Sequence, residues 1–430
     1  MKLIIHRGTQ EIGGSCVELA TSRTRILLDF GLPLVSKSKE PFDSKILTGK
    51  SIAELKKLEI LPDIKGLYKG EPKEIDALLI SHSHPDHYGL LNYLHPDIPV
   101  YLSQGVKELI EISSDFTPIK VSAFNSRIIN NETTFSIGDI KVTPYLVDHS
   151  AFDARAFLIE ADGKRLFYSG DFRGHGRKSC LFNKIIKNPP QDVDCLLMEG
   201  TSLGRDDKGY PNELVVQKRI AEILRKADNI TFLFVSSQNI DRIVSAYKAC
   251  LETNSIFVID VYTAYILERL SSISKGIPQF NWNNIRLKFH FRQGKILADK
   301  ESLKTLYRYK TNKIDFKEIN NSKQKILFLS RYNSLFPHIL KKLKNYKGAK
   351  VIYSLWEGYL TAKFRDFCKE NKLVIAKVHS SGHAKPEDLK RFAKALNPKV
   401  LIPIHTFYAD RYRELFKRVK ILKDKELFTL

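Results

Sequence analysis

The chain has 430 residues, with 70 lysines and arginines against 48 acidic residues and a formal net charge of +22. This length exceeds that of one ordinary hydrophobic core and favours two domains. The charge favours a polyanionic partner such as nucleic acid, with a lysine-rich soluble surface as the plainer alternative. The five cysteines are scattered and form no C-x-x-C pair, which argues against a disulfide framework or a cysteine-rich zinc site.

The N-terminal residues 1–19 interrupt their apolar run with charge after five positions, unlike the long apolar core of a signal peptide. No run elsewhere approaches the roughly 20 apolar residues that a membrane span requires. We therefore expect a cytoplasmic protein without a membrane partner.

The first two hundred residues predict short strands separated by turns. Between two alternating runs, Asp162 and Gly163 indicate a hairpin, because this pair readily adopts the left-handed backbone of a tight turn. From Glu213 the pattern changes to helices alternating with β-branched apolar runs, which predicts parallel strands covered on both faces. Strands return after about residue 351, and a short basic helix is expected within 409–428.

Six of the predicted strand ends carry polar side chains suited to chemistry. Strands of layered α/β folds deliver such side chains to one rim in a rigid frame, so we expect these ends to lie close together. The six segments are 77–87, 145–150, 166–172, 196–202, 375–384 and 401–407.

The densest of these ends is SHSHPDH at 81–87, which follows an apolar run. In an extended backbone His82 and His84 point to the same side, and the turn that follows brings Asp86 and His87 around. Four metal-binding side chains in six positions after a buried strand have no packing rationale. Imidazole and carboxylate are natural ligands for zinc or manganese. The segment therefore predicts a metal site and can supply ligands to two adjacent ions.

Three further side chains at strand ends are expected to complete this site. Asp171 ends a strand on the same rim and is the most plausible carboxylate to bridge two ions. His149 and His405, taken singly, are more often hydrogen-bonded histidines than ligands. The cluster at 82–87 raises the odds that both are ligands.

The order of these motifs resembles the ligand motifs of the metallo-β-lactamase fold. The matching segments are HSHPDH (82–87), DHS (148–150), YSGDF (168–172) and IPIHTF (402–407). The segment LLDFG (27–31) resembles the first motif of that fold, which implies that Asp29 supports the site from behind the ligands. Three segments also resemble the additional motifs of the β-CASP nucleases, the family that contains RNase J and the nuclease subunit of the pre-mRNA cleavage factor. They are MEGTS (198–202), VHSSGHA (378–384) and again IPIHTF.

The resemblance covers nearly the whole chain and implies an α/β fold: a metallo-β-lactamase αββα sandwich with an inserted β-CASP α/β domain. We expect the first part of the metallo-β-lactamase domain at 1–204, the β-CASP domain at 205–355 and the returning C-terminal part at 356–430. Such a return explains how His405 can reach a site that begins at His82.

The resemblance further implies two divalent metal ions, zinc with manganese as the alternative, and hydrolysis of a phosphodiester by water that the two ions activate. One ion is expected on His82, His84 and His149, and the other on Asp86, His87 and His405, with Asp171 between them. Asp86 is also expected to orient the attacking water or accept its proton.

Other motif residues are expected to act on the substrate. His383 is the candidate for protonating the leaving oxygen or gripping the scissile phosphate. Glu199 is expected to fix the tautomer of His383, with capping of the next segment as the structural alternative. Ser380, Ser381 and the backbone of Gly382 are expected to donate hydrogen bonds to a phosphate.

His405 in the last motif is typical of RNA-processing members of the group, so a ribonuclease acting on single-stranded RNA is the first hypothesis. The competing hypotheses are a DNA-directed β-CASP nuclease, a non-catalytic nucleic-acid-binding subunit and a small-molecule hydrolase with the same metal core. A second copy of the chain is a further candidate partner. Exonucleolytic and endonucleolytic cutting both stay open, because residues 352–362 differ from the serine-rich segment that forms the 5′-phosphate pocket of RNase J.

Overall fold

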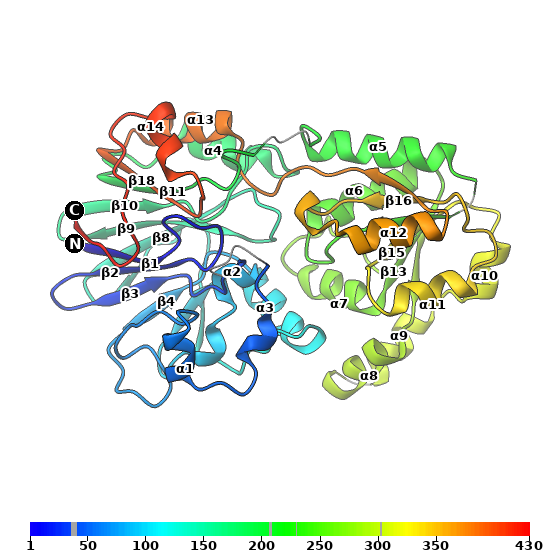
Figure 1. Cartoon of the computed structure of the whole chain (residues 1–430), viewed down its shortest axis with the longest axis horizontal. Coiled ribbons are helices and arrows are strands. Elements are labelled where there is room, and N and C mark those ends of the chain that lie inside the picture. Colours follow the sequence, from blue (N-terminus) through cyan, green and yellow to red (C-terminus); the bar gives the residue numbers. More distant parts are fainter. Residues whose placement is uncertain (36–40, 206–208, 229, 302) are drawn as a thin grey trace. The chain divides into compact units, whose positions relative to one another are not determined.

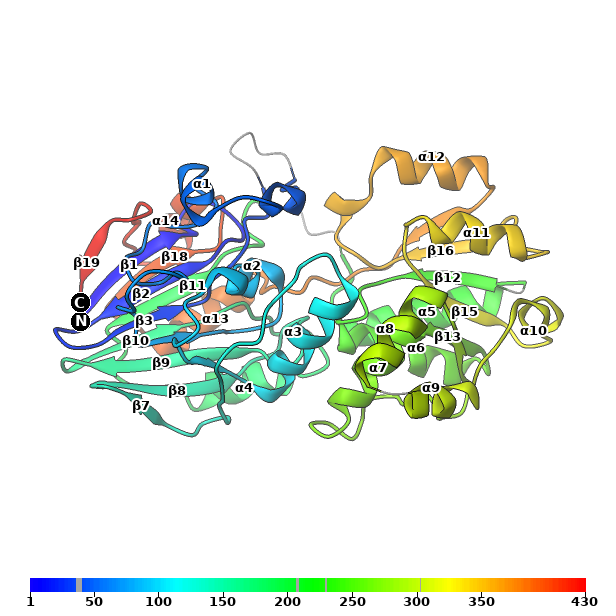
Figure 2. The same cartoon turned by 90° about the horizontal axis from the view of Figure 1, so that it is seen from below.

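The computed structural model describes residues 1–35, 41–205, 209–228, 230–301 and 303–430. These residues form two compact units (Figures 1 and 2). The first unit comprises Met1–Asp207 and Gly382–Leu430, and the second comprises Lys208–Ser381. Within the described residues, no helix has the length and apolar character needed to cross a bilayer.

The first unit contains two β-sheets with a shared apolar core. One sheet has the strand order β19-β1-β2-β3-β4-β5-β6, and the other has the order β18-β11-β10-β9-β8-β7. Strands of the first sheet are β1 (Lys2–Arg7), β2 (Cys16–Ala20), β3 (Arg25–Leu28), β4 (Ala77–Leu79), β5 (Val100–Leu102), β6 (Ser126–Ile128) and β19 (Leu427–Thr429). Those of the second sheet are β7 (Phe135–Ile137), β8 (Ile140–Leu146), β9 (Arg155–Ala161), β10 (Lys164–Tyr168), β11 (Cys195–Glu199) and β18 (Val400–Ile404).

Helices cover the outer face of each sheet, which gives four layers (Figure 1). The helices are α1 (Ile52–Lys57), α2 (Pro85–Tyr88), α3 (Gln104–Phe116), α4 (Ser179–Lys187), α13 (Pro386–Leu396) and α14 (Tyr412–Leu415). Leu55 of α1 and Val106 of α3 pack with the outward side chains of β4, while Phe182 of α4 and Phe392 of α13 pack with those of β10 and β11. The αββα sandwich is confirmed.

The alternation that predicts the strands places their apolar side chains between the sheets. Leu3 and Val17 from the first sheet share one buried cluster with Phe157 and Ile159 from the second. The hairpin expected at Asp162 and Gly163 joins β9 to β10, with both residues at positive φ (51° and 69°). The turn sequence therefore fixes the register of this pair.

The second unit is a six-stranded sheet of order β14-β13-β15-β12-β16-β17, and all of its strand pairs are parallel. Its strands are β12 (Ile230–Phe234), β13 (Ile256–Asp260), β14 (Ile285–Lys288), β15 (Ile326–Ser330), β16 (Lys350–Tyr353) and β17 (Val374–Lys377). Its helices are α5 (Glu213–Lys226), α6 (Ile240–Glu252), α7 (Val261–Leu270), α8 (Phe291–Lys300), α9 (Leu303–Lys310), α10 (Phe316–Asn321), α11 (Leu335–Lys342) and α12 (Ala362–Glu370). Figure 2 shows α11 and α12 on one side of this sheet and α6 and α7 on the other, so the predicted doubly covered parallel sheet is present.

Two features near the end of the chain differ from the sequence-based expectations. The second unit extends to Ser381 and not to 355, because β17 pairs with β16 and completes the second sheet. The short basic helix expected in 409–428 is present only at its start, as a turn of 3-10 helix at Ala409–Arg411 and α14; beyond Leu415 the chain is not helical and continues to β19, which pairs with β1. Backbone hydrogen bonds at this sheet edge override the local helix propensity.

Candidate metal centre

The candidate metal centre lies entirely within the first unit, where strand ends converge. The segment 81–87 follows β4, His149 follows β8, Asp171 follows β10 and His405 follows β18. Apart from the partly exposed His84, the predicted ligands are buried. Seven polar side chains from distant parts of the sequence therefore share one interior region.

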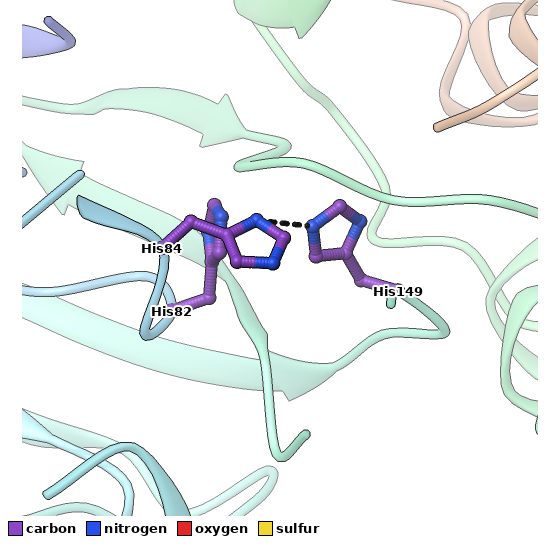
Figure 3. A group of neighbouring side chains, drawn as sticks. All are labelled: His82, His84 and His149. Atoms are coloured by element: carbon purple, nitrogen blue, oxygen red, sulfur yellow. Dashed lines mark hydrogen bonds between the residues drawn. The ribbon is translucent and has the colours of Figure 1, made fainter. Parts of the chain in front are cut away.

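Three histidines form the first group of the centre. Each of His82, His84 and His149 offers a ring nitrogen, and these nitrogens lie within 4.8 Å of one another. Nε2 of His149 and Nδ1 of His84 are 3.2 Å apart, and Figure 3 shows the two rings facing each other with His82 beside them. This arrangement offers three neutral nitrogen donors to one ion.

Asp86, His87 and His405 form the second group, again with candidate ligand atoms within 4.8 Å of one another. Nε2 of His405 lies 3.1 Å from Oδ2 of Asp86. Asp171 contacts both groups, because its Oδ2 lies 3.7 Å from Nε2 of His82 and 3.3 Å from Nε2 of His87. The structure thus places all seven predicted ligands close together, and Asp171 also forms overlapping groups with His82 and His87 and with Glu199 and His383.

The donor atoms of this cluster fit a divalent cation. Nε2 of His82, Nε2 of His87 and both carboxylate oxygens of Asp171 are buried, and none of them makes a hydrogen bond to a described residue. Burying unsatisfied polar atoms is costly unless another partner compensates. A divalent metal ion coordinated by imidazole nitrogen and carboxylate oxygen supplies that compensation.

Asp29 supports the cluster from behind by accepting four hydrogen bonds from three residues. Its Oδ2 accepts hydrogen bonds from Nδ1 of His87 at 2.8 Å, from the Ser81 hydroxyl at 2.8 Å and from the Tyr168 hydroxyl at 2.7 Å. The Ser81 backbone N–H donates to its Oδ1 at 2.7 Å. Ser81 and Tyr168 were not singled out from the sequence, although Tyr168 stands inside the YSGDF motif and Ser81 directly precedes HSHPDH.

Thr201 is a further contact that the sequence did not reveal. Its hydroxyl lies 2.8 Å from Nδ1 of His405, which leaves Nε2 of that ring facing Asp86. His405 has a positive φ of 55°, an uncommon backbone conformation for a residue with a side chain. The only sequence signal for Thr201 was that it lies in the MEGTS motif.

Glu199 lies next to His383 and to the backbone of two loops. Its Oε1 lies 3.3 Å from Nδ1 of His383, and Oδ2 of Asp171 lies 3.6 Å from the same nitrogen. The Glu199 carboxylate also accepts backbone N–H bonds from Thr201 at 3.0 Å and from Ala384 at 3.3 Å. It therefore faces His383 and also holds the loops on either side.

The three expected phosphate donors fall in different units. Ser380 and Ser381 belong to the second unit, where the buried Arg242 guanidinium donates to the Ser380 carbonyl at 3.2 Å. Gly382 belongs to the first unit, and a Cβ at this position would lie 2.4 Å from the Ser150 hydroxyl oxygen. Only glycine fits this close approach, while donation to a phosphate by any of the three stays a prediction.

Electrostatics divide the histidines into two kinds. Burial lowers the pKa of His82 and His149 well below the ordinary value, and that of His84 to about 4. These rings are neutral near pH 7, as metal ligands must be. Burial also opposes the charged form of His87, but the carboxylates of Asp171, Asp29 and Asp86 outweigh it and raise the pKa of His87 well above its ordinary value.

The carboxylates of the centre stay ionised. Burial opposes the charge of Asp86, but the neighbouring His87 and His405 lower its pKa to about 2. Burial likewise opposes the charge of Asp171, and His405, His87 and His383 hold its pKa well below the ordinary value. For His383, burial and the charge of Arg205 oppose protonation, while Glu199 and Asp171 raise the pKa.

Two family matches bear on this geometry. Residues 61–273 match the family described as a Beta-lactamase superfamily domain, and residues 371–426 match a Zn-dependent metallo-hydrolase RNA specificity domain. A Ribonuclease J from Helicobacter pylori is 22% identical over 425 residues, which cover 93% of this chain and 55% of that protein. The chain belongs to the metallo-β-lactamase-fold β-CASP family.

Other members of the family are similar over different shares of their length. A Ribonuclease J from Mycoplasma genitalium is 24% identical, covering 94% of this chain and 67% of that protein. An RNase J-like protein from Methanocaldococcus jannaschii is 23% identical, covering 99% of this β-CASP chain and 97% of that protein. The chain thus spans about half the length of the Helicobacter relative and nearly all of the archaeal one.

A solved structure shares the fold of this β-CASP protein. It is a protein of unknown function from Enterococcus faecalis V583, with a TM-score of 0.78 and 22% sequence identity. The match covers 100% of this chain and 99% of the other.

Proposed function

We propose that this chain is a metal-dependent ribonuclease that hydrolyses phosphodiester bonds of single-stranded RNA. The observation that carries the proposal is the position of Asp171, whose carboxylate contacts both groups of candidate ligands and makes no hydrogen bond to a described residue. The similarity to proteins named Ribonuclease J and the net charge of +22 support RNA as the substrate.

Two ions are proposed, with zinc as the first choice and manganese as the alternative. His82, His84 and His149 would hold one ion, and Asp86, His87 and His405 the other, with Asp171 shared. When bound, such ions lower the pKa of water and neutralise charge on a phosphate.

The protein side chains would then divide the proton transfers between them. Asp86, with its pKa of about 2, is deprotonated near neutral pH and is proposed to orient the attacking water, a role that this low pKa favours over acceptance of the proton. His383 keeps its proton more readily than an ordinary histidine, because Glu199 and Asp171 raise its pKa against the effect of burial. His383 therefore suits protonation of the leaving oxygen. Hydrogen bonds to the phosphate are proposed from Ser380, Ser381 and the Gly382 N–H.

The test uses metal-stripped protein reloaded with zinc or manganese and incubated with matched 20-nucleotide RNA and DNA strands. RNAs with a 5′-phosphate, 5′-triphosphate or 5′-hydroxyl are compared by product length. Cleavage of RNA supports the proposal, and mononucleotide products indicate exonucleolytic cutting whereas internal fragments indicate endonucleolytic cutting. Cleavage of DNA alone would select the DNA-directed alternative.

A matched variant separates catalysis from contamination. Asp86→Asn is expected to lose cleavage while His338→Ala, a change at an exposed histidine of α11, is expected to retain it. Binding of RNA without cleavage under either metal would contradict the proposal and select the non-catalytic binding subunit.

A further inference from the structure

A surface cavity of about 390 Å³ lies in the first unit beside the loops that carry the candidate catalytic residues. Its walls come from the loop after β11, from the start of α13 and from the segment after β18. The lining residues are Ser202, Leu203, Gly204, Arg205, Pro386, Arg411, Glu414 and Leu415. The cavity uses none of the candidate metal ligands.

Covalent and hydrogen-bonded links place this cavity next to the metal centre. The wall segment 202–205 directly follows Thr201, whose hydroxyl contacts His405 at 2.8 Å. The Ser202 hydroxyl donates to the Ala384 carbonyl, one residue after His383 and two before the wall residue Pro386. A strand whose scissile phosphate sits at the centre would therefore have this cavity within reach of its neighbouring nucleotides.

An exposed aromatic ring stands at the edge of the cavity. Tyr408 is 42% exposed, and its ring lies so close to Gly204 that a Cβ there would stand 2.5 Å from a ring carbon. The backbone of Gly204 thus makes room for the ring. The neighbouring Phe407, the last residue of the IPIHTF motif, is 41% exposed, so two aromatic rings in succession are partly exposed to solvent. Exposed aromatic rings near a basic site are the usual platforms for unpaired bases.

The charge of the cavity suits a phosphate backbone. Among the described residues, the Arg205 and Arg411 guanidinium groups and the Glu414 carboxylate line it. The Arg411 guanidinium lies 5.2 Å from the centroid of the Tyr408 ring, and it forms no ion pair with any described residue. An arginine held over an aromatic ring, with its charge not neutralised by a carboxylate, is available to a phosphate while the ring stacks on a base.

We propose that this cavity is a subsite for single-stranded RNA next to the scissile bond, in which Tyr408 stacks on a base and Arg411, with Arg205, holds a neighbouring phosphate. The inference rests on the proposed function, since it names a surface that binds the substrate of that same centre. Duplex RNA, whose bases are paired and stacked, does not offer Tyr408 an open face.

The test measures binding without cleavage, in chelator and with the full chain, by fluorescence anisotropy of a labelled 12-nucleotide single-stranded RNA. Tyr408→Ala and Arg411→Ala are each expected to weaken binding about tenfold, and Arg411→Ala also to reduce the salt dependence by about one phosphate contact. Arg413→Ala is the matched control, because this arginine is 64% exposed in the adjacent α14 and lines no part of the cavity.

Binding equal to wild type in both cavity variants would overturn the proposal, and so would an equal loss in Arg413→Ala, which would indicate diffuse surface charge. Tyr408→Leu keeps the packing on Gly204 without a stacking ring, and it must weaken binding as Tyr408→Ala does. A duplex of the same sequence must be insensitive to Tyr408→Ala. Binding is measured in chelator, where the protein holds no metal and does not cleave. The binding results therefore test this subsite even if the earlier experiment detects no RNA cleavage.

Discussion

His87 and Asp29 form a fully buried pair, with 2.8 Å between Nδ1 of the imidazole and Oδ2 of the carboxylate. Because Asp29 accepts a hydrogen bond from the Nδ1–H group of His87, the Nε2 atom of the ring faces the carboxylates of Asp171 at 3.3 Å and Asp86 at 3.8 Å. Such a contact sets the tautomer and the basicity of a metal-binding imidazole. The pair therefore determines how His87 is presented to a metal ion.

We expect Asp29→Asn to lower zinc affinity about 10- to 100-fold, because the amide is a weaker acceptor for the imidazole N–H. The fold is expected to survive, since asparagine has the same shape and tolerates the positive φ of 60° at this position. Competition with a chromophoric chelator measures the affinity. Asp97→Asn, which changes an exposed aspartate 3.9 Å from His95, is the control. Unchanged affinity in Asp29→Asn would show that the contact only stabilises the fold.

The two candidate ligand groups predict separate losses of metal. His149→Ala and His405→Ala each remove one nitrogen from a different group, so each is expected to reduce bound zinc from about two ions to about one per chain. Elemental analysis after dialysis against trace zinc measures the content, with His338→Ala as the control at an exposed position. Retention of two ions in both variants would contradict the grouping.

His383 and Glu199 are expected to separate catalysis from metal binding. His383→Ala should lower kcat for RNA cleavage about 10²- to 10⁴-fold while metal content stays at the wild-type level. Glu199→Gln removes the charge beside His383 and keeps one acceptor oxygen, which can serve either the Thr201 N–H or the Ala384 N–H, because these donate to different carboxylate oxygens. A fall in kcat with an unchanged melting temperature supports the electrostatic role. Wild-type kcat in Glu199→Gln would leave loop capping as its whole function.

The stability of the second unit is expected to depend on pH through Asp260. Burial opposes the charge of this carboxylate, but Arg331 outweighs it and lowers its pKa below the ordinary value of 3.8. A lowered folded-state pKa means that the stabilisation is present above pH 3.8 and is lost as the pH falls below that value.

Asp260→Asn is therefore expected to lower the free energy of unfolding by about 3 kcal/mol at pH 7, where Arg331 loses a charged partner. The difference from wild type should shrink at pH 3. Urea unfolding at the two pH values, followed by circular dichroism, provides the measurement. An equal difference at both values would mean that the ion pair does not carry the effect.

Thiol chemistry tests the burial of the cysteines. All five cysteines are free, and Cys180 is exposed whereas Cys16, Cys195, Cys250 and Cys368 are buried. Burial also raises the pKa of the buried thiols, so they are poor nucleophiles at neutral pH. Ellman's reagent is expected to titrate one thiol quickly in the folded protein and five in guanidinium chloride. Two or more fast thiols would contradict the packing.

Local signals in the sequence predict short strands followed by an α/β segment, whereas the αββα sandwich was implied by the resemblance of the motifs. Alternating strands, the Asp162 and Gly163 turn and the β-branched runs after Glu213 each depend on neighbours within a few residues. The C-terminal segment shows where this reasoning fails, since 409–428 has the composition of a basic helix. Pairing of β19 with β1 joins residues separated by almost the whole chain, and no local pattern reports it.

For the candidate site, the sequence by itself determined the chemical types of the ligands and their position at strand ends, because six such ends carry histidine or carboxylate side chains. Only the tertiary structure decided which atoms meet: Asp171 against both groups, Thr201 against His405, and Tyr408 over Gly204. The physical reason is that sheet order and loop packing set these distances, and both arise from contacts between segments far apart in the chain.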